Sequence, residues 1–80
     1  MMNDTQLKAA INIIASVLGC KKADLSGDTY IGSLSQWDSI AHMTIILAFE
    51  EKLGRQLSTK EIASLENVSS FAELLAPKDE

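Results

Sequence analysis

A nearly apolar segment at residues 39–53 dominates the middle of this 80-residue chain. Asp38 stands immediately before it as a favoured helix N-cap, and Gly54 follows it as a typical helix stop. The segment therefore predicts a helix from Ser39 to about Leu53. A helix that is apolar almost all the way round must be covered by other segments or by a partner. In so short a chain, any cover that the chain itself supplies has to come from one small core.

Projection at about 100° per residue divides this helix into two faces. The predicted core face contains Ile40, Met43, Ile46, Leu47 and Leu53. The predicted outer stripe is narrower and contains Ala41, Thr44, Ala48 and Glu51. Because that stripe is only weakly polar, we expect it to be covered, either by the rest of the domain or by a partner that binds transiently.

An apolar spacing of i, i+3, i+4 and i+7 predicts an earlier helix that begins at about Asp4 or Thr5 and ends at Leu18, with Gly19 as its stop. Its apolar positions are Leu7, Ala10, Ile11, Ile14, Val17 and Leu18. This face would form one wall of the core.

Two short helices are expected near the end of the chain. Ser58 and Glu61 form a capping box, which predicts a helix that continues to about Leu65. Ser70 and Glu73 repeat the same spacing and predict the start of the last helix. The inward residues of that helix would be Phe71, Leu74 and Leu75.

Pro77 is expected to end the last helix, because proline interrupts helical hydrogen bonding. Together these patterns predict an all-α fold in one domain over residues 1–80. The fold would be a four-helix bundle with one short helix and a long loop between the two long helices.

Residues 20–37 are predicted to form that long ordered loop, because they contain Gly27, Gly32 and several serines and threonines. Its apolar anchors would be Leu25, Tyr30, Ile31 and Leu34. Trp37 is expected to be a core anchor at the end of the loop, since burial of its large side chain is strongly favourable. A long loop in a small domain is often functional, and this one would deliver Ser39 to an exposed corner.

Composition limits the classes of partner. Eleven acids against seven bases give a net charge of −4, which disfavours nucleic acid and favours basic surfaces on other proteins. The lone Cys20 cannot form an internal disulfide, and no group of cysteines and histidines predicts a metal site. These features fit a reducing, cytoplasmic setting. The longest largely apolar run, residues 40–49, is far shorter than the roughly 20 residues needed to cross a bilayer.

One targeting pattern competes with this interpretation. Lys8 followed by an apolar stretch that ends at Cys20 resembles a bacterial lipoprotein signal, which would be cut before that cysteine. Asp4 stands where such a signal is basic, and Asn12 interrupts the apolar stretch. The helical spacing of the same stretch gives it a second explanation, which we favour.

The run Trp37-Asp38-Ser39-Ile40-Ala41-His42-Met43, placed before a long helix, resembles the prosthetic-group segment of acyl carrier proteins. The resemblance extends from about residue 7 to residue 75 and includes Asp28-Thr29 and the two short helices. In that family, the serine of an Asp-Ser-Leu motif carries 4′-phosphopantetheine, whose thiol holds the cargo as a thioester. The resemblance implies attachment at Ser39, a site that includes Asp38, and no catalytic activity of the chain itself.

Physical chemistry is consistent with a phosphate on Ser39. The first N–H groups of a helix have no intrahelical partner, and the helix dipole places partial positive charge there. The alternative interpretation is purely structural: Asp38 and Ser39 are an ordinary helix cap. His42, one turn after Ser39, also raises a serine hydrolase as a hypothesis. We reject it because a base on the same helix turn is poorly aimed and so small a domain offers little pocket.

The resemblance also implies partners: a phosphopantetheinyl transferase, and acyl-loading and acyl-transfer or condensing enzymes. The predicted partner-binding residues are Ile40, Ala41, Thr44, Ala48, Glu50 and Glu51. Fatty-acid carriers commonly have acids at the positions of Ala41, Thr44 and Lys52, so this surface is less acidic than theirs. It predicts a specialised pathway rather than housekeeping fatty-acid synthesis. Glu51 is expected to pair with Arg55 at i+4.

An acyl pocket is predicted between the helix at 39–53 and the one that follows it. Its lining would be Ile46, Leu47, Leu57, Ile62 and Leu65, which are equally expected as plain core.

Other functions stay open. An unmodified helical interaction domain would use the outer stripe alone, and peptidyl or aminoacyl carriers commonly show a Gly-Gly-His/Asp-Ser pattern that this chain lacks. A monomer is the default for a mobile shuttle.

Overall fold

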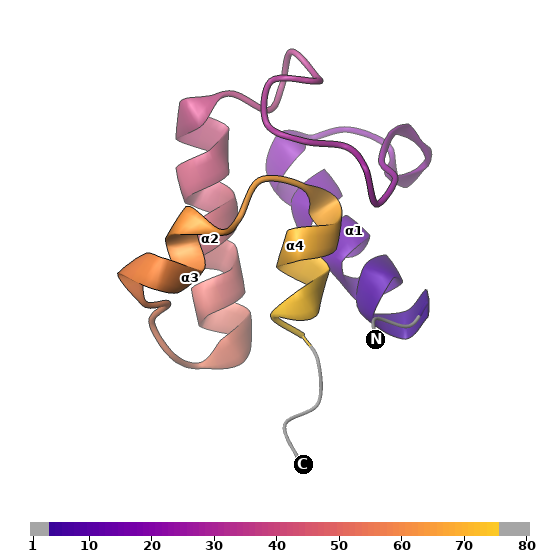
Figure 1. The fold of residues 1–80 in the computed structure, drawn as a ribbon. Helices are drawn as coiled ribbons and strands as arrows, with labels where there is room; N and C mark the ends of the chain where they lie inside the picture. The colour runs from indigo at the N-terminus through magenta and orange to yellow at the C-terminus, as the bar shows by residue number, and fades with distance from the viewer. Residues whose placement is uncertain (1–3, 76–80) are drawn as a thin grey trace.

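The computed structural model describes residues 4–75, which form an all-α fold. Its elements are α1 (Asp4–Leu18), a 3₁₀ turn η1 (Lys22–Asp24), α2 (Ser39–Leu53), α3 (Thr59–Ala63) and α4 (Val68–Glu73). The predicted four-helix fold is therefore confirmed. In Figure 1, the two long helices α1 and α2 flank the short α4, and α3 lies beside α2. α1 packs against both α2 and α4. None of the described helices is long and apolar enough to span a bilayer.

The predicted limits of the two long helices are confirmed. Asp38 is extended, and its carboxylate accepts a hydrogen bond from the backbone N–H of Ala41 at 2.8 Å. At the other end Gly54 has φ 72°, in the left-handed region that favours glycine, and its N–H reaches the carbonyl of Glu50 at 2.8 Å. Gly19 ends α1 in the same conformation, with φ 71°.

The two short helices begin with capping boxes, of which only one was predicted correctly. Ser58 caps α3 as expected: its hydroxyl accepts from the N–H of Glu61 at 3.1 Å, and the Glu61 carboxylate accepts from the N–H of Ser58 at 2.8 Å. α3 ends at Ala63, two residues before the predicted end.

The cap of α4 is Asn67 with Ser70, not Ser70 with Glu73. The Asn67 side chain accepts from the N–H of Ser70 at 2.8 Å. Asparagine is as good an N-cap as serine, and an earlier start lets the fully buried Val68 join the helix. The predicted stop at Pro77 lies outside the described residues.

The buried core draws on α1, α2, α4 and the loops, whereas α3 contributes no buried residue. Its members are Ala10, Ile14, Ala15, Leu18, Leu25, Trp37, Ile45, Ile46, Phe49, Leu57, Leu65, Val68, Phe71 and Ala72. Phe71 was predicted to point inward and is fully buried, whereas Leu74 and Leu75 are half-buried.

The predicted core face of α2 is wrong at three positions. Ile40, Met43 and Leu47 are 79%, 56% and 60% exposed, respectively. Of the same predicted face, Ile46 is buried and Leu53 is half-buried, while the other buried residues of α2, Ile45 and Phe49, were not predicted. α2 carries apolar side chains on nearly every side, so its hydrophobic pattern does not distinguish a buried face from an exposed one. Which face is buried is determined by packing against the rest of the fold.

The long loop is tied to the start of α4. The Ile31 N–H donates to the carbonyl of Glu66 at 3.2 Å, and the Val68 N–H donates to the carbonyl of Thr29 at 2.9 Å. Among the predicted anchors, Leu25 is buried and Ile31 and Leu34 are half-buried. Tyr30 is 55% exposed, so its predicted anchoring by side-chain burial is wrong. Its contribution comes from the backbone, which forms an isolated bridge with Asn67.

Candidate functional site

Ser39 is the first residue of α2 and is exposed to solvent. Two hydrogen bonds of Asp38 hold the turn around it: the carboxylate accepts from Ala41, and the backbone carbonyl accepts from the N–H of His42 at 2.9 Å. In Figure 1 this end of α2 lies at the opposite end of the molecule from the start of α1 and the end of α4. The loop and the cap thus present the Ser39 hydroxyl at an open corner, as predicted.

The corner suits a phosphoester. The Asp38 carboxylate is already engaged by the Ala41 N–H, and the Ser39 hydroxyl makes no side-chain hydrogen bond with any residue in the range 4–75. The N-terminal turn of the 15-residue helix α2 supplies partial positive charge. A bulky group on the Ser39 oxygen would therefore extend into solvent without displacing the core.

Trp37 lies directly before this corner and is a core anchor, as predicted. It is fully buried, and its indole Nε1–H donates to Nδ1 of His42 at 3.0 Å. The two rings are stacked, with centroids 6.1 Å apart and planes at 27°. His42 also meets the ring of Phe71 edge-on at 5.5 Å.

His42 is used for this packing and not for Ser39. Burial lowers the pKa of the imidazole, and a hydrogen bond with the backbone of Leu65 opposes part of that change. Nδ1 accepts from Trp37, so the neutral ring carries its proton on the other nitrogen. Because Nδ1 is bonded to Trp37 and the ring packs on Phe71, His42 is not placed to be the base of a serine nucleophile, which agrees with our rejection of a hydrolase.

The outer surface of α2 is more apolar than predicted. Of the six predicted partner-binding residues, Ile40, Thr44 and Glu51 are exposed and Ala41, Ala48 and Glu50 are half-buried. The sequence projection missed two exposed residues of this surface, Met43 and Leu47. They follow Ile40 at i+3 and i+7, so the three form one row along the helix, which we call the apolar strip. The sequence did contain a signal for this row, because residues at i+3 and i+7 lie on the same side of a helix as residue i, which here is Ile40.

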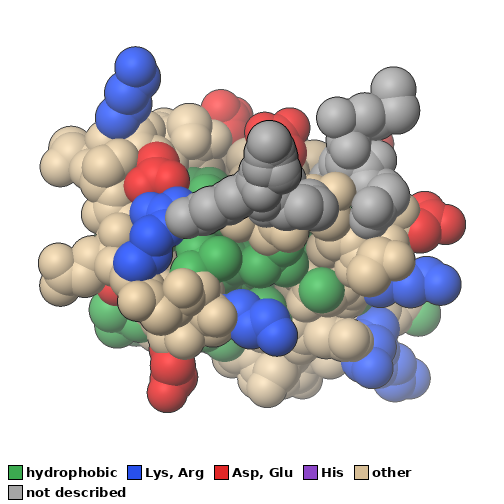
Figure 2. Space-filling model, turned by 90° about the horizontal axis from the view of Figure 1, so that it is seen from below, with side chains coloured by type: hydrophobic (Ala, Val, Ile, Leu, Met, Phe, Trp, Pro, Cys, Tyr) green, Lys and Arg blue, Asp and Glu red, His purple; other side chains and the backbone are tan. Residues whose placement is uncertain are grey.

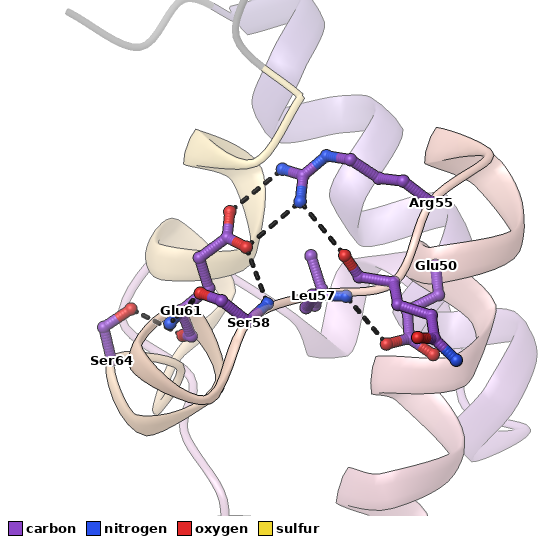
Figure 3. Close-up of polar contacts among 7 residues, drawn as sticks. Glu50, Arg55, Leu57, Ser58, Glu61 and Ser64 are labelled. Atoms are coloured by element: carbon purple, nitrogen blue, oxygen red, sulfur yellow. Dashed lines mark hydrogen bonds and ion pairs between the residues drawn. The ribbon is translucent and has the colours of Figure 1, made fainter.

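The C-terminal end of α2 is held by polar contacts (Figure 3). The Glu50 carboxylate accepts from the Leu57 N–H at 2.9 Å, which ties the α2–α3 loop back to the helix. Arg55 makes two hydrogen bonds to the carboxylate of Glu61, at 3.0 Å and 2.9 Å. These contacts hold the pKa of Glu61 down to about 2 and raise that of Arg55.

The predicted pairing of Glu51 with Arg55 is therefore wrong. α2 ends at Leu53, and the left-handed Gly54 turns the chain out of the helix before Arg55. Residues i and i+4 meet only on a continuous helix, so the guanidinium reaches α3 instead.

The residues predicted for an acyl pocket divide into three groups. Ile46, Leu57 and Leu65 are buried, Ile62 is half-buried, and Leu47 is exposed and belongs to the apolar strip.

Two surface hollows lie elsewhere. One, of about 350 Å³, is lined by Thr5, Gln6, Ala9, Lys52, Leu53, Leu74 and Leu75. The other, of about 460 Å³, is lined by Lys8, Ile11, Asn12, Lys22 and Ala23. Figure 2 views the end of the molecule opposite Ser39 and shows apolar side chains gathered there among charged ones.

Comparison with known proteins identifies the family of the chain. A family model described as a phosphopantetheine attachment site matches residues 8–75, which is most of the 80-residue chain. A search of curated proteins found no match. The matched region contains the loop, the capped start of α2 and both short helices. The chain therefore belongs to the phosphopantetheine attachment-site family and is a non-catalytic carrier protein whose covalently attached cofactor is 4′-phosphopantetheine.

Proposed function

We propose that Ser39 is the residue to which a phosphopantetheinyl transferase attaches the 4′-phosphopantetheine arm, with Asp38 fixing the turn that presents it. The observation that carries this proposal is the exposed hydroxyl at the first position of a capped 15-residue helix. The cofactor supplies the thiol that holds cargo as a thioester. The chain's own residues supply an accessible oxygen, a rigid corner and a surface for partner enzymes.

The loaded carrier would then pass acyl or related groups between separate acyl-loading and acyl-transfer or condensing enzymes. The pathway we propose is fatty-acid-like, polyketide or otherwise specialised. The apolar strip supports a specialised pathway, because exposed Ile40, Met43 and Leu47 extend along α2 from the residue after Ser39. Basic partner enzymes would be better matched by an acidic surface there. Partners that dock there would contribute apolar contacts, with Thr44 and Glu51 at the edge and the half-buried Ala41, Ala48 and Glu50 behind them.

The cargo pocket is proposed for the region that contains Ile46, Leu57, Ile62 and Leu65, where an acyl chain would have to displace core contacts. Each buried CH₂ would contribute roughly 0.8 kcal/mol. We also propose that the protein acts in the cytoplasm and as a monomer, since the lone Cys20 fits a reducing compartment and a shuttle must leave each partner.

Two other functions remain as alternatives. A peptidyl or aminoacyl carrier would use the same attachment residue with a smaller, more polar cargo. An unmodified interaction domain would use only the apolar strip, whose exposure is the observation in its favour. The first alternative would appear as a different cargo on the same arm, and the second as the absence of any arm.

Intact mass measured before and after incubation with coenzyme A and a broad-specificity phosphopantetheinyl transferase tests the proposal. We expect the parent chain to gain one phosphopantetheine and Ser39→Ala to gain none. Ser35→Ala is the matched control, because this exposed serine lies four residues earlier in the loop. It should be modified like the parent. Failure of the parent chain with several transferases would favour the unmodified interaction domain, and modification of Ser39→Ala would place the arm on another residue.

A further inference from the structure

His42 is the only histidine of the chain, and its side chain is engaged with groups from three parts of the fold. It accepts a hydrogen bond from Trp37 in the loop and packs edge-on against Phe71 of α4, and the backbone of Leu65, between α3 and α4, raises the pKa of its imidazole. Its own backbone N–H closes the first turn of α2 on the carbonyl of Asp38. One side chain thus connects the helix that begins at Ser39 to the long loop and to α4.

Trp37 is the joint between the long loop and α2. Its N–H donates to the carbonyl of Leu34 at 3.0 Å, and its carbonyl accepts from the N–H of Gly32 at 2.9 Å. Ser39 follows only two residues later. Any shift of Trp37 is therefore passed through Asp38 to the first turn of α2.

The hydrogen bond between the two rings depends on the chemistry of histidine at position 42. An indole N–H can only donate, and Trp37 is fully buried, so water cannot readily replace its acceptor. The acceptor is Nδ1 of neutral His42. An apolar side chain of similar size would fill the space but would leave the indole N–H unpaired, and the joint could move to relieve it.

The geometry points to His42 as a positioning residue for Ser39, which acts by fixing Trp37 at the entrance to α2 so that the serine hydroxyl meets the transferase in one orientation. This inference rests on the proposed attachment at Ser39. In the transfer, the Ser39 oxygen forms a bond to phosphorus and the diphosphate bond of coenzyme A breaks. Adenosine 3′,5′-bisphosphate leaves, and the hydroxyl proton passes to the transferase.

The test measures kcat and KM of phosphopantetheine transfer to the parent chain and to variants. Circular dichroism selects a temperature at which every variant is folded. His42→Leu removes the acceptor and should lower kcat/KM about tenfold, because a small misplacement of a reacting group is costly. The loss should lie in kcat, since the apolar strip that meets the transferase is unchanged. His42→Gln offers a carbonyl acceptor and should recover most of the rate.

Trp37→Phe provides an independent arm of the test, because it removes the donor and keeps an aromatic ring. It should lower kcat as His42→Leu does, and the double variant should be no slower than either single variant, since both remove the same hydrogen bond. Ile14→Ala is the control for stability alone. This residue is fully buried on α1, so its truncation should lower the melting temperature without changing kcat/KM.

Each outcome has a definite meaning. If folded His42→Leu and Trp37→Phe are modified at the parent rate, His42 only fills space and the inference is overturned. A rate loss in Ile14→Ala equal to that in His42→Leu would overturn it as well, because destabilisation alone would then explain the effect. A parent chain that accepts no phosphopantetheine would remove the proposed function and this inference with it, whereas equal rates across the variants remove only the inference.

Discussion

The two ends of α2 are held by different kinds of interaction. At the Ser39 end, the fully buried Trp37 and its contacts with His42 and Phe71 fix the chain. At the Gly54 end the contacts are polar, and the side chains of Arg55 and Glu61 are 37% and 32% exposed. Buried apolar contacts are insensitive to salt, and substitutions there strongly lower stability. Exposed ion pairs are screened by salt and contribute little to stability. The end that presents the serine should therefore be the more rigid of the two and the more sensitive to mutation.

Truncation of Trp37 should have the largest effect on stability. Trp37→Ala removes a fully buried aromatic side chain and should lower the free energy of unfolding by about 3–5 kcal/mol. In a domain whose total stability is about 4–12 kcal/mol, the variant is at the edge of unfolding. Urea denaturation followed by circular dichroism measures the change. Tyr30→Ala is the matched control, because this aromatic side chain is 55% exposed and its truncation should cost far less.

Loss of the cap at Asp38 should be the next largest effect. Asp38→Ala removes the acceptor of the Ala41 N–H and should cost about 1 kcal/mol of stability. Asp38→Asn keeps an acceptor of the same shape without the charge and should stay close to the parent chain. Urea midpoints of the three proteins distinguish a capping role from a charge effect. Equal losses in the alanine and asparagine variants would mean that the charge, and not the cap, stabilises this end.

The limits of the helices could be predicted from the sequence because local signals decide them. Asp38, Gly54, Gly19 and Ser58 each act within one turn of chain, and each occupies its expected position. The start of α4 was missed because two capping residues competed there, and the burial of Val68, a tertiary effect, favours the earlier one.

The orientation of α2 and the contacts of its ends could not be predicted in the same way. Ile40 and Met43 are as apolar as the buried Ile45 and Phe49, so composition alone does not choose between the two faces. The pairing of Arg55 depends on the direction of the chain after the left-handed Gly54. The hydrogen bond between Trp37 and His42 spans five residues across a loop–helix junction, a separation that no helical spacing rule covers.

Protonation of His42 should weaken the Ser39 end at acid pH. The groups that face the imidazole are uncharged: the Trp37 indole, the Phe71 ring and the backbone of Leu65. Because burial lowers its pKa in the folded state from 6.5, the unfolded chain takes up the proton first as the pH falls. This contribution to stability is therefore fully present above about pH 6.5 and is lost as the pH falls from there through the folded-state pKa.

Urea midpoints at about pH 7.5 and about pH 5.5 measure this effect. The parent chain should be less stable at the lower pH, and His42→Gln should lose much of that difference because glutamine does not titrate. An unchanged difference in the glutamine variant would assign the pH dependence to other groups and leave the Trp37–His42 hydrogen bond intact across the range.

The smallest effect should come from the ion pair at the Gly54 end. Glu61→Gln removes the charge that Arg55 meets and keeps an acceptor for the Ser58 N–H, so α3 should remain capped. We expect a smaller shift in the urea midpoint than for Asp38→Ala, and one that disappears in about 1 M NaCl. Since the pKa of Glu61 is lowered from 4.5 to about 2, its contribution is present above about pH 4.5 and is lost as the pH falls toward 2. Arg55→Gln should match Glu61→Gln, and the double variant should add nothing further. A loss that persists in high salt and equals that of Asp38→Ala would mean that the two ends of α2 are held equally firmly, contrary to the comparison drawn from their burial.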